Sequence, residues 1–258
     1  MTVTRVDIAH GLSALGVKPG DNLLIHSSLS SFGEVEGGAD AVIDGALDAV
    51  TYKGFVLGTL MVPTLTGHRG LSPDNPPHID LRTAACWTGV IPETLRTRAD
   101  AVRSIHPTHS CAAIGNQAQK LLQRHEWSPT PCGVLSPYYG LATANGKIVL
   151  LGCGLESCTT FHTIEELANV DYHLQPDLSF GSCIDSRGNR IQTPCRLHSY
   201  EGPEREFSVM VPILLSRGFM WTGVIGDCEA FVIDAAGLIV STLECLRSDP
   251  HFLCRTTD

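Results

Sequence analysis

The sequence has no long apolar run, no excess of basic residues and no Lys/Arg cluster. Its apolar stretches fall short of the roughly 18 residues that a membrane span needs, and residues 1–10 contain no apolar core of a signal peptide. Lys and Arg total 18 against 27 Asp and Glu, for a formal net charge of −9, so no basic face is available for phosphate. We expect a cytoplasmic protein that engages neither membrane nor nucleic acid.

Paired-cysteine motifs are also absent, although the chain contains ten cysteines. They are scattered without any CxxC pair, and in a 258-residue chain with no export signal we expect reduced, mostly buried thiols. A zinc site would need two close pairs of ligands, and no such pattern occurs. We therefore predict no metal site.

Common catalytic signatures are missing as well, but one stretch stands out. The sequence has no P-loop, no GxGxxG after its first predicted strand, no GxSxG and no HExxH. The apolar run 148–151 predicts a buried strand, Gly152 and Gly154 break it, and helical spacing starts at Thr159, with Ser157, Thr159 or Thr160 available as the N-cap. His162 lies in the first turn of that helix with Glu165 three residues on, so the carboxylate can support the imidazole as a base. A surface histidine beside solvated carboxylates is the alternative.

Strands and helices alternate along the rest of the chain. Apolar patterns predict strands over 22–25, 54–62 and 111–114, a hairpin over 178–184 and 190–194, and a final strand followed by a helix. Helical patterns cover 6–15, 38–52, 88–98, 117–125 and 138–143. No repeat or linker interrupts them, so we expect one α/β domain.

Three polar segments are candidates for binding. The loop from His26 to Ser31 has hydroxyls and N–H groups that suit a phosphate or pantetheine chain, or it is an ordinary turn. Ser27 or Ser28 as a nucleophile with His162 as its base also stays open. His106 and His109 flank a proline in a loop before a strand. Each either faces a cleft or is a structural histidine whose ring nitrogens are hydrogen-bonded to the backbone. The long loop 64–77 suggests a lid or a substrate rim.

Seven segments, taken together and in order, resemble the aminoglycoside 3-N-acetyltransferase family. These are the antibiotic N-acetyltransferases, whose fold is unrelated to that of the GNAT acetyltransferases. The resemblance runs from about Leu15 to Ala168, with a weaker echo through Phe207. The matching segments are 15–21, 24–29, 59–64, 89–94, 103–110, 146–152 and 159–165.

The resemblance implies a fold and a reaction. The fold would be a mixed central sheet flanked by helices, in a single antibiotic N-acetyltransferase domain over residues 1–258. The reaction would be transfer of an acetyl group from acetyl-CoA to the 3-amine of an aminoglycoside, conferring antibiotic resistance, without a metal. His162 matches the family's catalytic histidine and Glu165 the acidic residue after it. The protein would be a monomer or a homodimer. Contacts to CoA are carried over to these positions: His26, Ser27, Ser28, Leu29, Ser30, Ser31, Thr108, His109 and Ser110.

The acceptor site departs from the family pattern. Some members present an acidic residue to the aminoglycoside in the loop after Pro63, where this chain has Gly67-His68-Arg69. Asp74 and Asp80 are the candidates to replace it, and Glu201 lies where members place a further acidic residue. A polycationic antibiotic is held mainly by carboxylates. Acetyl transfer to a different amine, such as a biosynthetic intermediate, and a non-catalytic CoA-binding relative are therefore the alternatives.

Overall fold

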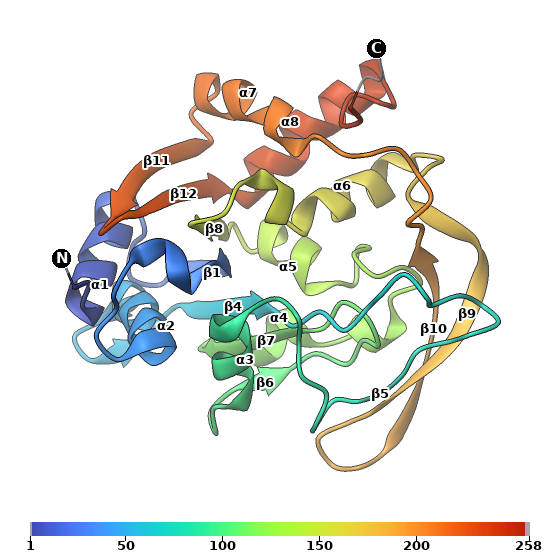
Figure 1. The fold of residues 1–258 in the computed structure, drawn as a ribbon, viewed down its shortest axis with the longest axis horizontal. Helices are drawn as coiled ribbons and strands as arrows, with labels where there is room; N and C mark the ends of the chain where they lie inside the picture. The colour runs from blue at the N-terminus through green and yellow to red at the C-terminus, as the bar shows by residue number, and fades with distance from the viewer. Residues whose placement is uncertain (1, 256–258) are drawn as a thin grey trace.

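The computed structural model describes residues 2–255 and is built around a seven-stranded sheet (Figure 1). The strand order is β11-β12-β8-β1-β4-β7-β6. Its three central strands are parallel: β1 (Asn22–Ser27), β4 (Thr59–Pro63) and β8 (Lys147–Leu151). The outer strands are antiparallel: β6 (Val102–Arg103), β7 (Cys111–Gly115), β11 (Met220–Ile225) and β12 (Cys228–Asp234). The predicted α/β class with a mixed sheet is confirmed.

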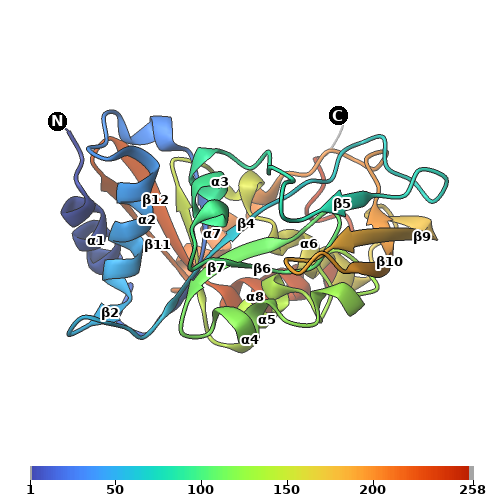
Figure 2. The ribbon, with the colours of Figure 1, turned by 90° about the horizontal axis from the view of Figure 1, so that it is seen from below.

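Helices cover both faces of this sheet, and the alternation of side chains along β1 shows why two cores form. Leu24 packs into one apolar cluster, whereas Leu23 and Ile25 pack into the other. The second cluster takes residues from α1 (Arg5–Ala14), α2 (Gly38–Ala49) and α3 (Val90–Thr97). The first takes them from α4 (Ala118–Leu122), α5 (Pro137–Thr143), α6 (Thr160–Ala168), α7 (Val211–Ser216) and α8 (Ala235–Ser248). Figure 2 shows α1 and α2 gathered at one end and α4, α5 and α8 beneath the sheet.

A smaller sheet projects beside the large one. It contains β9 (Leu174–Ile184) and β10 (Arg190–His198), the predicted hairpin, with β5 (His78–Asp80) parallel to β9. The predicted loop 64–77 carries no helix or strand, and it is tied to β9 where the Gln175 side chain donates to Leu71 O at 3.0 Å. The loop therefore forms a rim fixed to this sheet. The remaining short elements are β2 (Thr51–Tyr52), β3 (Phe55–Val56), η1 (Leu29–Phe32), η2 (His125–Trp127), η3 (Leu155–Ser157) and η4 (Phe207–Met210).

Several predicted elements differ in extent from those observed, among them the helix predicted over 117–125, which ends at Leu122. The helix predicted over 38–52 ends at Ala49, and the strand predicted over 54–62 is two strands, β3 and β4. Gly54 has a φ of +82°, and a Cβ at Gly58 would lie 2.1 Å from Asp21 O, so the chain turns and passes close to its neighbour at these glycines. Similarly, the single final strand is the hairpin β11–β12, which turns at Gly226 (φ +63°).

No helix within residues 2–255 is both long and apolar enough to cross a membrane.

Candidate active site

The carboxyl ends of the three parallel strands open onto one cavity of about 320 Å³. In α/β proteins, ligands bind at this edge of the sheet. His26 and Ser27 come from the end of β1, Pro63 from the end of β4, and the loop after β8 contributes residues 153 and 156–159. The cavity is completed by Leu65, Trp87, Thr88, Pro92 and His162.

His162 reaches this cavity from the first turn of α6. Thr159 occupies the N-cap position, without a capping hydrogen bond from its side chain. His162 Nδ1 lies 2.8 Å from Glu165 Oε2, and the imidazole is 30% exposed whereas the carboxylate is fully buried. The Nδ1 proton is therefore directed at Glu165, which leaves Nε2 as an acceptor, the tautomer that a general base requires. The structure forms the His162–Glu165 pair predicted from the sequence.

The buried Glu165 carboxylate is surrounded by cationic and imidazole groups. Arg205 Nε lies 3.1 Å from Oε1, and His173 Nδ1 lies 3.0 Å from Oε2. Burial alone would raise the pKa of Glu165, but the hydrogen bond with His162 and the charges of His162, His173 and Arg205 lower it to about 2. Glu165 is therefore ionised at neutral pH.

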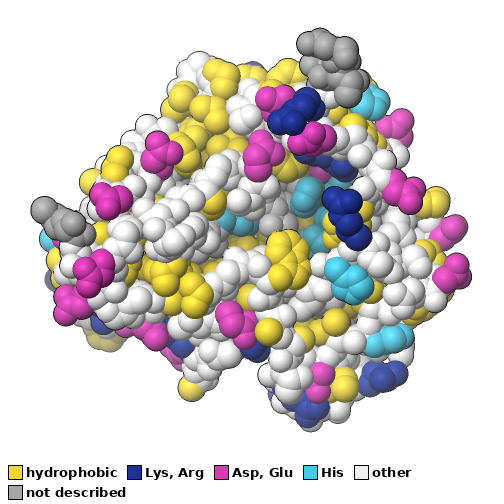
Figure 3. All heavy atoms as spheres, in the orientation of Figure 1, with side chains coloured by type: hydrophobic (Ala, Val, Ile, Leu, Met, Phe, Trp, Pro, Cys, Tyr) yellow, Lys and Arg dark blue, Asp and Glu magenta, His cyan; other side chains and the backbone are white. Residues whose placement is uncertain are grey.

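Two further buried side chains, His198 and Glu166, extend the cluster behind Glu165. His198 Nε2 lies 3.1 Å from Glu166 Oε1, and the same oxygen accepts from the Cys132 backbone N–H at 2.9 Å. Burial lowers the pKa of His198 and of His109 well below the ordinary value, and neighbouring histidines lower them further. Neutral imidazoles therefore line the base of a hollow in the surface, where Figure 3 shows histidine side chains between basic and acidic ones.

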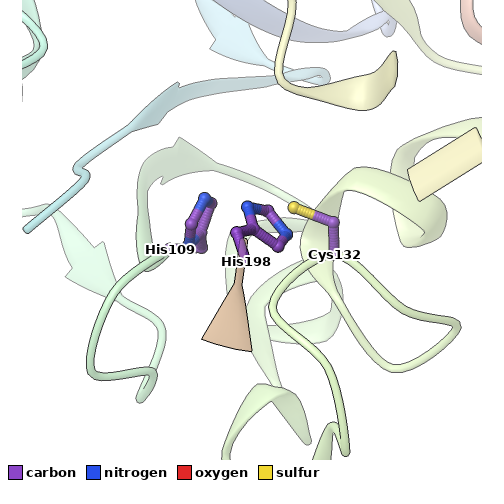
Figure 4. A group of neighbouring side chains, drawn as sticks. All are labelled: His109, Cys132 and His198. Atoms are coloured by element: carbon purple, nitrogen blue, oxygen red, sulfur yellow. The ribbon is translucent and has the colours of Figure 1, made fainter. Parts of the chain in front are cut away.

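The cluster contains donor atoms close enough to hold a metal ion. Figure 4 shows His198 lying between His109 and Cys132, and one donor atom from each lies within 4.8 Å of the others. Hydrogen-bonding partners already occupy one nitrogen of each ring, His109 Nδ1 with Thr108 Oγ1 at 2.9 Å and His198 Nε2 with Glu166. Burial raises the pKa of the Cys132 thiol well above its usual value, so sulfur stays protonated.

A second cavity, of about 450 Å³, meets the first at His162 and Glu156. Trp87 and Tyr200 line it as aromatic walls. Its charged residues are mixed in sign: Glu156, Glu204, Arg69 and Arg205. His109, His173 and His198 also line it. This cleft admits a molecule to the face of His162, and its charge is not predominantly acidic.

The residues predicted to contact CoA are placed in three different ways. His26 and Ser27 line the first cavity, and Ser27, Ser28, Leu29 and Ser30 line an adjoining groove of about 600 Å³. Ser31 instead donates to Gly152 O at 3.1 Å, which ties this loop to the loop after β8. Ser110 is fully buried with its hydroxyl donating to Thr64 O, Thr108 is buried at a small separate pocket, and His109 lines the cleft at His162.

The three carboxylates predicted to bind the acceptor are placed outside the cleft. Asp80 is paired with Arg82 at 2.7 Å, Asp74 is exposed on the rim loop, and Glu201 is exposed beside the cleft. Among the described residues, the carboxylates that line the cleft are Glu156 and Glu204, and Glu204 also contacts Arg255 at 2.9 Å.

Sequence reasoning missed the partners of the carboxylates on α6. His173, His198 and Arg205 lie 8 to 40 positions after Glu165, with no common spacing to indicate that they meet. The β9–β10 hairpin and the segment after it bring them together, and such contacts depend on tertiary structure.

Comparisons with known proteins identify the family of the chain. A family model described as aminoglycoside 3-N-acetyltransferase matches residues 24–247. The chain is 31% identical to aminoglycoside N(3)-acetyltransferase IX of Micromonospora chalcea, over 90% of this chain and 89% of that protein. It is also 31% identical to aminoglycoside N(3)-acetyltransferase VII of Streptomyces paromomycinus, over 92% and 89%. The crystal structure of aminoglycoside acetyltransferase AAC(3)-Xa superposes with a TM-score of 0.82 at 31% identity, covering 99% of this chain and 95% of that one.

Fold and relatives together define an acetyl-CoA-dependent acetyltransferase. More particularly, the chain belongs to the aminoglycoside 3-N-acetyltransferase family, as the resemblance of its sequence segments predicted.

Proposed function

We propose that this protein acetylates the 3-amine of aminoglycoside antibiotics, with His162 as the general base, and thereby confers resistance. The observation that carries the proposal is the position of His162, which lines both the cavity at the strand ends and the cleft beside it. A base that removes a proton from an attacking amine must stand between the acyl donor and the acceptor.

The groove along Ser27 to Ser30 leads into the first cavity through Ser27. We place the pantetheine arm of acetyl-CoA along this groove, with its thioester beside His162 and the acceptor in the second cavity. The amine nitrogen attacks the thioester carbonyl, His162 Nε2 takes a proton from that nitrogen, and the C–S bond breaks to release CoA as its thiolate. Glu165, ionised and hydrogen-bonded to Nδ1, stabilises the imidazolium that forms. On this proposal residues 1–258 act as one domain.

The test is release of CoA thiol by wild type and His162→Ala, using aminoglycosides with and without a free 3-amine. Wild type should turn over only the compounds with the 3-amine. His162→Ala should lower turnover about 10²- to 10⁴-fold. Calorimetry should show that acetyl-CoA still binds the variant, because the groove is unchanged. Near-normal turnover in His162→Ala would remove the base assignment.

One observation favours a second acceptor class. Arg69 lines the cleft near the ring of Tyr200, with its guanidinium carbon 5.8 Å from the ring centroid. Arg205 lines it as well, so two positive charges balance the negative charges of Glu156 and Glu204. A mixed cleft suits an amine with fewer positive charges than an aminoglycoside. If acetyl-CoA binds and no aminoglycoside is acetylated, an amine of that kind becomes the acceptor to pursue. A non-catalytic relative would bind CoA and acetylate no amine at all.

A further inference from the structure

Glu165 Oε2 is approached by two imidazoles. His162 Nδ1 lies 2.8 Å from this oxygen and His173 Nδ1 lies 3.0 Å from it. The two rings are stacked, with centroids 5.0 Å apart and planes inclined by 18°. The same carboxylate oxygen therefore serves the exposed ring that reaches the cleft and a second ring that is only 2% exposed.

The fold holds His173 firmly in this position. The chain leaves α6 through Asn169, in a left-handed conformation with a φ of +52°, and folds back to His173 just before β9. The backbone carbonyl of His173 accepts from Ser199 N–H at 2.7 Å. On the ring's far side, His173 Nε2 lies 3.8 Å from Glu166 Oε1. The imidazole thus lies close to two buried carboxylates, although neither ring nitrogen has a hydrogen-bonding partner among the described residues.

Near Glu165, His173 is neutral and Arg205 carries the positive charge. Burial lowers the pKa of His173, which keeps the ring neutral at neutral pH, and the charges of Glu165 and Glu166 only partly offset that effect. Arg205 supplies the permanent positive charge, on the other oxygen of Glu165. Among the described residues, the other titratable or charged groups near the three side chains are Arg69, Glu156, Glu166, Tyr172, Glu204, His109, His198, Cys132 and Cys254.

We propose that His173 is a positioning residue for the acetyl transfer. Its ring stacks on His162 and places Nδ1 3.0 Å from Glu165 Oε2, which keeps that carboxylate against Nδ1 of His162 and limits how strongly Glu165 favours the protonated form of the base. This inference rests on the proposed role of His162 as the base.

Substitutions at His173 should therefore shift the base in opposite directions according to charge. In His173→Leu, His162 is the one imidazole left beside Glu165 Oε2. The negative charge of Glu165 then stabilises the protonated form of His162 more strongly, and His162 takes up a proton more readily. The acidic limb of kcat/KM should then move to higher pH. In His173→Lys, a permanent cation lies next to Glu165 and about one ring spacing from His162, which disfavours a second positive charge. The limb should move to lower pH.

The experiment records kcat/KM for the acceptor against pH, at saturating acetyl-CoA, in wild type, His173→Leu, His173→Lys and His173→Asn. We expect shifts of about one pH unit for Leu and Lys, in the two opposite directions. His173→Asn keeps an N–H donor near the place of Nδ1 and should restore the limb toward that of wild type. His173→Leu should lower kcat roughly tenfold, because the carboxylate loses a contact that fixes it, with the KM for acetyl-CoA unchanged.

A matched control is His125→Asn. His125 is also fully buried and stacked on another histidine, His106, but its nitrogens are satisfied by Ser104 Oγ and Pro131 O, away from Glu165. This variant should lose stability without moving the limb.

Folding of each variant is checked by circular dichroism. If His173→Lys does not fold, the contrast between Leu and Asn decides the outcome. The positioning role would be overturned if the acidic limb of kcat/KM lay at the same pH in His173→Leu, His173→Asn and wild type. Shifts of the same sign in His173→Leu and His173→Lys would also overturn it, and either result would leave His162 as the base. Full activity in His162→Ala would instead overturn the proposed function itself.

Discussion

At the scale of single residues, the site depends on which side chains are ionised at neutral pH. Glu165 is ionised because its neighbours outweigh the effect of burial, while the buried histidines and thiols are kept neutral by that same burial. His162 differs from the other histidines of the cluster in keeping 30% of its side chain exposed. It is therefore the imidazole of the cluster that a molecule in the cleft can reach, as the proposed base must be.

Cys158 provides a test against thiol catalysis. It lines the first cavity, and burial raises the pKa of its thiol to about 12, so almost no thiolate exists near pH 7. Cys158→Ser should retain most of the wild-type turnover and lose about 1–3 kcal/mol of stability, because a hydroxyl replaces an apolar thiol in the core. Turnover and urea unfolding measure these two effects, intact mass after incubation with acetyl-CoA detects any acetyl adduct, and Cys153→Ser is the companion variant. Loss of turnover in a folded Cys158→Ser protein, or an acetyl adduct on wild type that this variant lacks, would establish a covalent thiol route.

At the scale of elements, the site is assembled where loops from different strands touch. Gly152, at the end of β8, has a φ of +66°, and a Cβ there would lie 2.2 Å from the Cβ of Ser31 in the proposed CoA loop. The Ser31 hydroxyl donates to the carbonyl of the same glycine. The two loops can approach this closely because position 152 has no side chain.

Gly152→Ala should therefore push the Ser27–Ser31 loop away from β8. We expect a higher KM for acetyl-CoA and a loss of about 1–3 kcal/mol in the free energy of unfolding, from strain at a left-handed position. Gly154→Ala is the matched control, because its φ is −88° and no described atom lies within 4 Å of the added Cβ. Steady-state kinetics and urea unfolding of both variants measure the difference. Equal KM values in the two variants would show that this contact does not shape the CoA groove.

The sequence predicted local elements better than the contacts between them. The apolar run 148–151, the glycine break and the helix carrying His162 and Glu165 all follow from patterns within about twenty residues, and all occur in the structure. The break between β3 and β4 was missed because Gly58 lies there for a tertiary reason, the close approach of Asp21 O. His173 and Arg205 were missed for the same kind of reason, since only the fold brings them to Glu165.

At the scale of the whole molecule, the carboxylates predicted to bind the acceptor differ from those that line the second cavity. Asp74, Asp80 and Glu201 were selected by their place in the chain, whereas the carboxylates facing the second cavity are Glu156 and Glu204. Glu156 lies in η3, between β8 and α6, where the sequence pattern shows a loop residue with no indication of its orientation. The charged side chains that line this cavity are therefore two carboxylates and two arginines, which together give little net attraction for a positively charged ligand.

The overall charge then becomes the main attraction for a polycationic acceptor. A formal net charge of −9 draws such a molecule toward the protein over a range of about 10 Å at 0.1 M salt, and added salt screens that attraction. We expect kcat/KM for an aminoglycoside to fall as NaCl is raised, more steeply for acceptors with more amines, with kcat nearly constant. Initial rates for a series of acceptors that differ in amine number measure this slope, and the KM for acetyl-CoA is recorded in parallel as the control for an anionic ligand. If salt has no effect on kcat/KM even for the most highly charged acceptor, electrostatic capture is not part of its binding, and an amine of lower charge becomes the better candidate for this cleft.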